Sequence, residues 1–352
     1  MGQSRVIRNK FAGTIEARRL AELARAAGLG DSPDDALHLH REAIALLGTD
    51  EETTLLADVL RWQGSVLRDR GRTSDAAPLY QRSLDVSTRL GYAAGRAHAF
   101  NCLASLAQRR GDMVESANLL TQSLAIAGQC DERRLVGMVQ QNLGIIADVR
   151  GNPAAALAHY QVALRTFEAT NDLQPMCWVM NNLGYLHVKE ERFDEAEAVF
   201  SRAIGIARAR GDLMAEGILE ENRAELHLLR GNPDDSYASI VRALSIADQR
   251  GDVIRHAAAL KLRGAYERIA GRPSEGADTL RHALTLSTAG EDALLGAEIL
   301  YQLGMALHAS GDLRMAHDVW KTALAAFEQI AARQWAGRVR ERLRIGGSGR
   351  YL

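Results

Sequence analysis

Apolar and small side chains recur along the chain with two superimposed periods. Between Thr14 and Gly28 they return every three to four residues, which predicts a helix that buries one face. The whole pattern then repeats about every 40 residues, with a small residue at the same place each time. These small residues are Ala24, Gly64, Ala104, Gly144, Gly184, Ala224, Gly264 and Gly304. A fixed period over so many units predicts an array of stacked repeats rather than separate globular domains.

Turn residues divide each repeat into two helices, here called A and B. The first turn of each repeat is marked by Asp31, Gly71, Gly111, Gly151, Glu191, Gly231, Gly271 and Gly311. Asn152-Pro153 and Asn232-Pro233 combine an N-cap residue with a first-turn proline, so they mark the start of helix B. Helix A is expected at about 14–28, 54–70, 93–110, 133–150, 174–190, 213–230, 253–270 and 293–309.

The same pattern predicts four segments. Residues 1–13 are expected to be a flexible lead, and residues 14–332 an array of eight units without an internal boundary. The periodicity breaks after Ala332. Residues 333–345 are expected to form a capping helix with Trp335, Val339 and Leu343 on one side, and residues 346–352 a disordered tail.

Small and bulky residues alternate between the two helices of a unit. A glycine or alanine in helix A is expected where helix A crosses its own helix B, because only a small side chain permits close approach. Helix B carries a large residue about 16 positions later, at Tyr80, Tyr160, Phe200 and Trp320. We expect these rings to fill the space against the next unit.

Leu-Gly in helix A, followed by alanine, an aromatic residue and alanine in helix B, resembles the signature of the tetratricopeptide repeat (TPR). The resemblance covers about residues 14–344, and the period looks like that of the 40-residue subclass, with its Leu-Gly-Asn repeat adaptors and bacterial sensor and regulator domains. It implies an all-α fold, a right-handed α-solenoid of about eight helix-turn-helix units plus a C-terminal capping helix. It also implies a concave groove, lined by helix A, that binds peptides, proteins or, more rarely, small ligands.

The resemblance further implies which residues face that groove, because the family uses positions two and three before the small residue and one and four after it. Of these, we take as candidates Arg61, Asn101, Gln141, Asn142, Asn181, Asn182, Tyr185, Glu221, Asn222 and Lys261. The carboxylate clamp of chaperone-binding relatives is not expected, because Lys261 has Ala265 where an asparagine is needed.

Three consecutive units place an asparagine two residues before the small residue, at Asn142, Asn182 and Asn222. Asparagine is a poor residue inside a helix, so the column needs a reason. A side-chain amide both donates and accepts, so the column suits the backbone of an extended peptide. Alternatively, these amides bond neighbouring helices inside the solenoid.

Composition excludes several classes of function. A formal net charge of −1 leaves the chain as a whole without the positive charge typical of nucleic-acid binding, and no phosphate-binding glycine loop is present. We expect no cofactor, no metal and no membrane contact. His187 and His227 are expected to be packed or exposed histidines rather than ligands. Glu216, Glu220, Glu221 and Glu225 are expected to form a solvated acidic face.

The sequence favours a non-catalytic scaffold that binds a protein or an extended peptide. The alternative is a ligand-responsive sensory module that controls a separate effector. An enzyme of the Rap-phosphatase type is not expected, because residues 1–30 are too short for the N-terminal bundle that such enzymes need. Three cysteines without C-x-x-C spacing indicate a reduced, cytoplasmic protein, and arginine in place of nearly all lysine is typical of a GC-rich bacterial genome.

Overall fold

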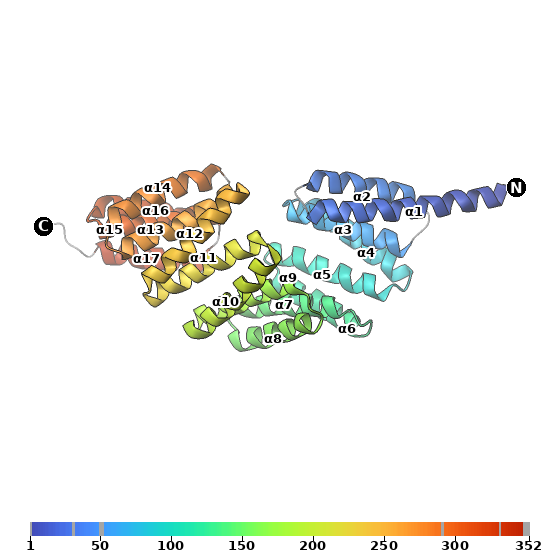
Figure 1. The fold of residues 1–352 in the computed structure, drawn as a ribbon, viewed down its shortest axis with the longest axis horizontal. Helices are drawn as coiled ribbons and strands as arrows, with labels where there is room; N and C mark the ends of the chain where they lie inside the picture. The colour runs from blue at the N-terminus through green and yellow to red at the C-terminus, as the bar shows by residue number, and fades with distance from the viewer. Residues whose placement is uncertain (1, 30–31, 49–52, 290–291, 331, 348–352) are drawn as a thin grey trace. The chain divides into compact units, whose positions relative to one another are not determined.

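The computed structural model describes residues 2–29, 32–48, 53–289, 292–330 and 332–347, and within these residues it contains helices and turns but no strand. Figure 1 shows the helices in chain order. They are α1 (Gly2–Leu29), α2 (Pro33–Leu47), α3 (Thr54–Asp69), α4 (Thr73–Arg89), α5 (Ala93–Arg109), α6 (Met113–Ala127), α7 (Arg133–Val149), α8 (Pro153–Ala169), α9 (Leu173–Lys189), α10 (Phe193–Arg210), α11 (Leu213–Arg230), α12 (Pro233–Arg250), α13 (Val253–Ile269), α14 (Pro273–Ala289), α15 (Ala293–Ala309), α16 (Leu313–Gln329) and α17 (Arg333–Gly347).

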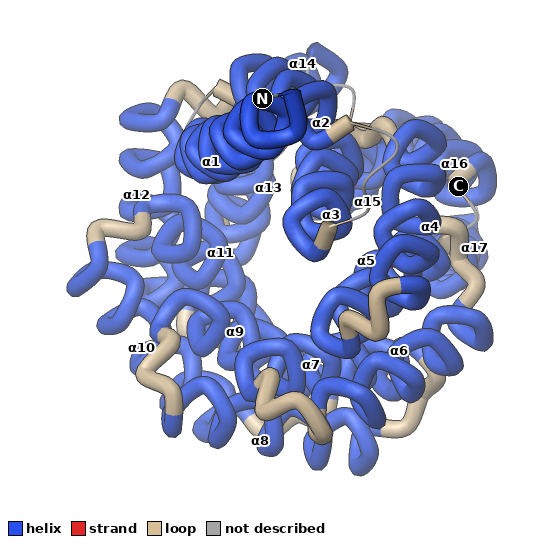
Figure 2. The backbone as a smooth tube through the Cα atoms, turned by 90° about the vertical axis from the view of Figure 1, so that its right-hand side faces the viewer, coloured by secondary structure: helices blue, strands red, loops and turns tan. Residues whose placement is uncertain are grey.

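The helices pack as two compact units, Met1–Asp172 and Leu173–Leu352, whereas the repeat predicts no internal boundary. In both units each odd-numbered helix packs on the even-numbered helix that follows it, so helix A and helix B form a hairpin. Figure 2 shows the two layers that result: α9, α11 and α13 lie on one side of the second unit, and α10 and α12 on the other. The fold is the all-α solenoid of helical hairpins that the sequence predicts.

The periodic glycines sit where helix A crosses helix B of the same repeat. A Cβ atom on Gly144 would lie 2.5 Å from a ring carbon of Tyr160, and one on Gly184 would lie 2.5 Å from Phe200. The aromatic rings therefore cover the glycine of their own repeat. Tyr80 also packs against the next unit, as expected, because it shares a buried apolar cluster with Cys102 and Leu106 of α5.

The turns recur at the predicted spacing because they need a residue in the left-handed region. Gly71, Gly111, Gly151 and the equivalent glycines have φ between 73° and 88°, and Glu191 takes their place with φ 57°. Several B and A helices begin at an aspartate or asparagine whose side chain accepts from a backbone N–H, as Asn152 does from Ala155. Asp31 lies outside the described residues.

Two chain ends differ from the predicted segments. Helix α1 begins at Gly2, so helical backbone runs through the segment expected to be a flexible lead. Gly13 is the one glycine inside this segment away from the helix end, and one glycine costs only about 1 kcal/mol. At the other end α17 packs on α16, with Trp335 stacked on Phe327 at 5.4 Å between ring centroids. The helix includes Gly346 and Gly347, and residues 348–352 lie outside the described residues.

Candidate functional site

Helix A of the second unit supplies the residues of two adjoining cavities. The first, of about 310 Å³, is lined by Tyr185, Glu221, Asn222, Lys261 and further residues of α11, α13 and α15. The second, of about 250 Å³, extends towards α17 and has Trp335 in its wall. Both cavities share a set of lining residues from α9, α11, α13 and α15. This set is Tyr185, Glu225, Lys261, Leu262 and Glu298. Four of the predicted groove residues are therefore brought together here.

Two cations and four carboxylates line the first cavity: Lys261, Arg255, Glu221, Glu225, Asp292 and Glu298. Lys261 Nζ pairs with Glu298 Oε2 on the next A helix. Burial alone would lower the pKa of Lys261, but Glu298, Glu225 and Glu221 together raise it, so the ammonium stays charged. Glu225 is exposed and has no ion pair among the described residues. The cavity thus presents a carboxylate that is available to a ligand.

Glu221 is a buried carboxylate at the edge of this cavity. Its Oε2 accepts a hydrogen bond from Arg255 Nη1 at 3.1 Å, across two A helices. Burial nevertheless raises the pKa of Glu221 to about 7, and the arginine only partly opposes that shift. The side chain therefore exchanges its proton near neutral pH.

The asparagine column bonds neighbouring A helices. In the first unit Asn142 Nδ2 donates to Asn101 Oδ1 at 3.0 Å. In the second unit Asn222 Nδ2 donates to Asn181 Oδ1 at 2.6 Å. Of the two interpretations left open by the sequence, the bond between helices is the one that the described geometry contains. Asn222 also lines the first cavity, so its amide is placed to do both.

The remaining candidates lie apart from the two cavities. In the first unit, Arg61 pairs with Asp58 at 3.0 Å and lies over the ring of Trp62. Gln141 is half-buried on α7, and Asn182 is half-buried on α9. Neither residue makes a side-chain hydrogen bond within the described part of the chain.

Several cavity residues were not among the sequence candidates. Arg255 and Glu298 lie nearer the N-terminus of their A helices than the positions that the family uses. Trp335 belongs to the predicted cap, which the repeat pattern does not assign to a groove. The sequence could have identified Glu225, because it follows Ala224 directly, as Tyr185 follows Gly184 at a position that the family uses.

The expectation of a solvated acidic face is wrong for Glu216 and Glu220, which are 2% and 0% exposed. Glu216 accepts from Arg208 and Arg242 at 2.8 Å, and Glu220 accepts from Arg208 at 2.7 Å and from Arg223 at 2.8 Å. These carboxylates are buried rather than solvated, and they are neutralised by Arg208 of α10, Arg242 of α12 and Arg223 of α11 itself. The helical period alone cannot show this, because two of the three partners lie on other helices.

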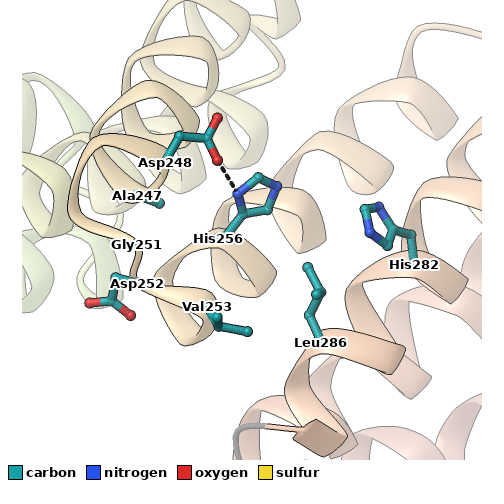
Figure 3. A pocket seen from close by; sticks show the side chains of 8 residues that line it. All are labelled: Ala247, Asp248, Gly251, Asp252, Val253, His256, His282 and Leu286. Carbon is teal, nitrogen blue, oxygen red and sulfur yellow. Dashed lines mark ion pairs between the residues drawn. The ribbon is translucent and has the colours of Figure 1, made fainter.

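A separate pocket lies at the turn between α12 and α13, on the side of α14 (Figure 3). Here His256 Nδ1 pairs with Asp248 Oδ1 at 2.6 Å, and the rings of His256 and His282 lie 6.5 Å apart. Among the described residues, no group of three histidine, cysteine or acidic side chains is placed to hold a metal ion. No described helix is both long and apolar enough to cross a membrane.

Comparison with known families matches models of the tetratricopeptide repeat to residues 55–127, 95–169 and 179–210. These residues belong to tetratricopeptide repeats (TPRs). No curated protein matches the chain in sequence.

Solved structures with the same fold belong to proteins of different kinds. Aspartyl phosphate phosphatase F from Bacillus subtilis is 13% identical, with a TM-score of 0.64 over 84% of this chain and 75% of that one. A Rap protein complexed with competence and sporulation factor is 10% identical, with a TM-score of 0.60 over 96% and 98%. A signal transduction ATPase with a TPR sensor from Pyrococcus horikoshii is 13% identical, with a TM-score of 0.62 over 87% and 52%. At these identities the likeness establishes the fold of the TPR chain.

Proposed function

We propose that this TPR protein is a non-catalytic scaffold that binds an extended peptide segment of a partner protein. The site is the pair of adjoining cavities lined by α9, α11, α13 and α15, which we call the second-unit groove. The observation that carries the proposal is that residues of four successive A helices are shared by both cavities. A ligand that fills both must be elongated across the helices, as an extended peptide is.

The chemistry of the second-unit groove also suits a peptide. Its lining combines apolar side chains such as Leu262 with many charged ones, so it suits a segment that carries both apolar and charged side chains. Asn222 offers an amide that both donates and accepts, and Glu225 offers a carboxylate. The three cysteines are free thiols, with Cys102 and Cys177 buried, which is consistent with function in the cytoplasm.

Selection of peptides tests the proposal. The full chain is screened against random peptides of about a dozen residues displayed with free C-termini, and selected peptides are measured by calorimetry. Tyr185→Ala should weaken binding by at least about fivefold, because a half-buried aromatic contact contributes about 1 kcal/mol or more. Tyr237→Ala is the matched control, since Tyr237 is 45% exposed against 47% for Tyr185 and lies on α12 outside both cavities.

The proposal is contradicted if no peptide is selected, or if Tyr237→Ala weakens binding as much as Tyr185→Ala does. Thermal melts of both variants show whether either loss comes from misfolding.

A second candidate, a sensory module that controls a separate effector, is supported by the likeness to a structure described as having a TPR sensor. It differs in one measurable consequence. A sensor must change its conformation when the ligand binds, because a ligand shifts an equilibrium only by its differential affinity for two states. Small-angle scattering of the full chain with and without a selected peptide distinguishes the two: an unchanged profile favours the scaffold, and a changed profile favours the sensor.

A further inference from the structure

Arg268 lies on α13 and lines the cavity that also contains Trp335 of α17, and no carboxylate of the described residues neutralises its charge. Its Nε atom is buried without a hydrogen-bond partner, and the guanidinium makes no ion pair within the described part of the chain. Burial lowers the pKa of Arg268, Tyr301 opposes this, and Arg342 adds a second positive charge. A partly buried cation without a counter-ion is costly, so it indicates a place for an anion.

Negative charge, in contrast, surrounds Lys261 in the same cavity. Lys261 is surrounded by Glu298, Glu225 and Glu221, and it pairs with the first of these. No carboxylate acts on Arg268 in the same way. The second-unit groove is therefore polarised, with an acidic part over α11 and α13 and a cationic part beside α17.

The residues around Arg268 also provide an apolar surface and limit the size of a ligand. Leu229, Ile269 and Trp335 line the cavity and supply an apolar surface. Gln302 also lines it, and its Oε1 atom is buried without a partner. The cavity, at about 250 Å³, is smaller than the ~300–1,000 Å³ of a site that encloses a drug-sized ligand. It therefore suits one end of a ligand rather than the whole of it.

We propose that this end of the second-unit groove binds the C-terminal residue of a peptide through its free carboxylate and an apolar side chain. The inference rests on the proposed function, because the rest of the peptide occupies the groove described above. The carboxylate accepts hydrogen bonds from the guanidinium of Arg268, and the side chain packs against Ile269 and Trp335. A cationic residue earlier in the peptide would then lie towards Glu225, which fixes the direction of the chain in the groove.

The contribution of Trp335 changes the role of α17. This helix covers the apolar end of the last hairpin, as a cap does, with Val339 buried against it. Its Trp335 also lines the cavity that contains Arg268. In our proposal the cap is part of the recognition site, and it determines where the bound peptide must end.

The test compares each selected peptide as a free acid and as a C-terminal amide, by calorimetry with the full chain. Amidation removes the negative charge and should weaken binding roughly 10- to 100-fold, the range for a hydrogen bond to a charged group. In Arg268→Gln the two forms should bind about equally, because the group that distinguishes them is gone. Arg268→Lys should keep part of the preference, since it retains the charge but not the forked geometry.

Arg314→Gln is the matched control, because Arg314 is exposed on α16 and lines neither cavity. It removes the same charge and should leave the ratio between acid and amide unchanged. Thermal melts verify that both glutamine variants fold.

The inference is overturned if amidation changes affinity less than about twofold, or if Arg268→Gln leaves the ratio as it is in the parent protein. It is also overturned if affinity survives amidation but is lost when an internal aspartate or glutamate is replaced, which would assign the carboxylate to a side chain. In each case the selected peptides still bind, so the proposed function stands while the inference falls.

Discussion

The two compact units use the same hairpin, yet among the described residues only the second unit buries carboxylates between its helices. In residues 1–172, serine hydroxyls donate to backbone carbonyls of the neighbouring helix, from Ser83 to Ala57 at 2.7 Å and from Ser123 to Ala97 at 2.7 Å. In residues 173–352, Ser236 donates to Ala224 in the same way at 3.1 Å, and carboxylates such as Glu216 and Glu220 are in addition buried among arginines.

The bonds from hydroxyl groups hold the repeat together, whereas the buried charged groups are particular to the unit that contains the proposed site. A hydroxyl that donates to a carbonyl is neutral, so it holds two helices together with little dependence on pH. Buried carboxylates must be neutralised by partners, and removing one partner leaves a charge without compensation. The second unit therefore has charged groups close to its groove, and its stability should depend on pH and on each partner.

The largest expected effect is common to both units. Gly144→Leu in the first and Gly184→Leu in the second should each lower the free energy of unfolding by about 3 kcal/mol or more, because the new side chain collides with Tyr160 or Phe200. Chemical denaturation measures the loss. Gly205→Ala is the control: nothing lies within 4 Å of its Cβ position, so this change within α10 should stabilise by up to about 1 kcal/mol. A small effect at either crossing would refute the shared hairpin geometry.

The next largest effect is a difference in stability loss between a charged group of the second unit and a neutral one of the first. Glu216→Gln weakens bonds to two arginines and should cost about 2 kcal/mol, within the range for hydrogen bonds to charged groups. Ser83→Ala removes one neutral hydrogen bond and should cost about 1 kcal/mol. Urea denaturation of both variants at neutral pH checks the order. Equal losses would mean that the charged cluster stabilises no more than a hydroxyl does.

The pH dependence of the second unit should follow from two carboxylates that act in opposite directions. Glu221 has a folded pKa of about 7, above its ordinary 4.5, so between these values the folded chain holds a proton that the unfolded chain lacks. Stability should therefore fall by about 2 kcal/mol as pH rises from 4.5 through 7. The hydrogen bond from Arg242 holds the pKa of Glu216 below its ordinary value, so its contribution is present at neutral pH and lost in acid.

Glu221→Gln checks the first of these directions. The variant should show a flatter dependence of unfolding free energy on pH between 5 and 8 than the parent, measured by urea denaturation. Glu225→Gln, an exposed change in the same groove, should leave the slope as it is. If both variants keep the slope of the parent, Glu221 does not titrate near neutral pH.

The asparagine pairs should give the smallest effect and the same one in both units. Asn142→Ala and Asn222→Ala each lose a bond to the preceding A helix, so each should destabilise by roughly 0.5–1.5 kcal/mol less the better helix propensity of alanine. Asn182→Ala, which loses no such bond among the described residues, should be neutral or slightly stabilising. Thermal melts compare the three. A large loss for Asn182→Ala would remove the distinction between bonded and unbonded asparagines.

Much of the fold could be predicted from the sequence because its determinants are local and periodic. Gly64 and Tyr80 recur at a fixed spacing, and the left-handed turn at Gly71 can be identified from the glycine alone. The period did not show that Tyr80 covers Gly64 of its own hairpin as well as packing against the next one, because spacing along the chain does not tell which helix a ring faces.

The site could be predicted only in part, for the same physical reason. Tyr185, Glu221, Asn222 and Lys261 stand at family positions and do line one cavity. Lys261 finds its partner at Glu298, 37 residues away, through packing that no local pattern encodes. Arg268 stands four residues after Gly264, which is also a family position, but it was not chosen as a candidate because only the structure shows that its Nε lacks a partner.

Photo-crosslinking tests most directly the central claim, that the ligand lies in the second-unit groove. Benzoylphenylalanine is placed at Ile269, which lines the groove and is 39% exposed, or at Val241, which is 47% exposed on α12 and lines neither cavity. The full chain is then irradiated with a selected peptide, and the products are mapped by mass spectrometry. Our account predicts a crosslink from position 269, near the C-terminus of the peptide, and none from position 241. A crosslink from position 241 alone, or from both positions equally, would contradict it.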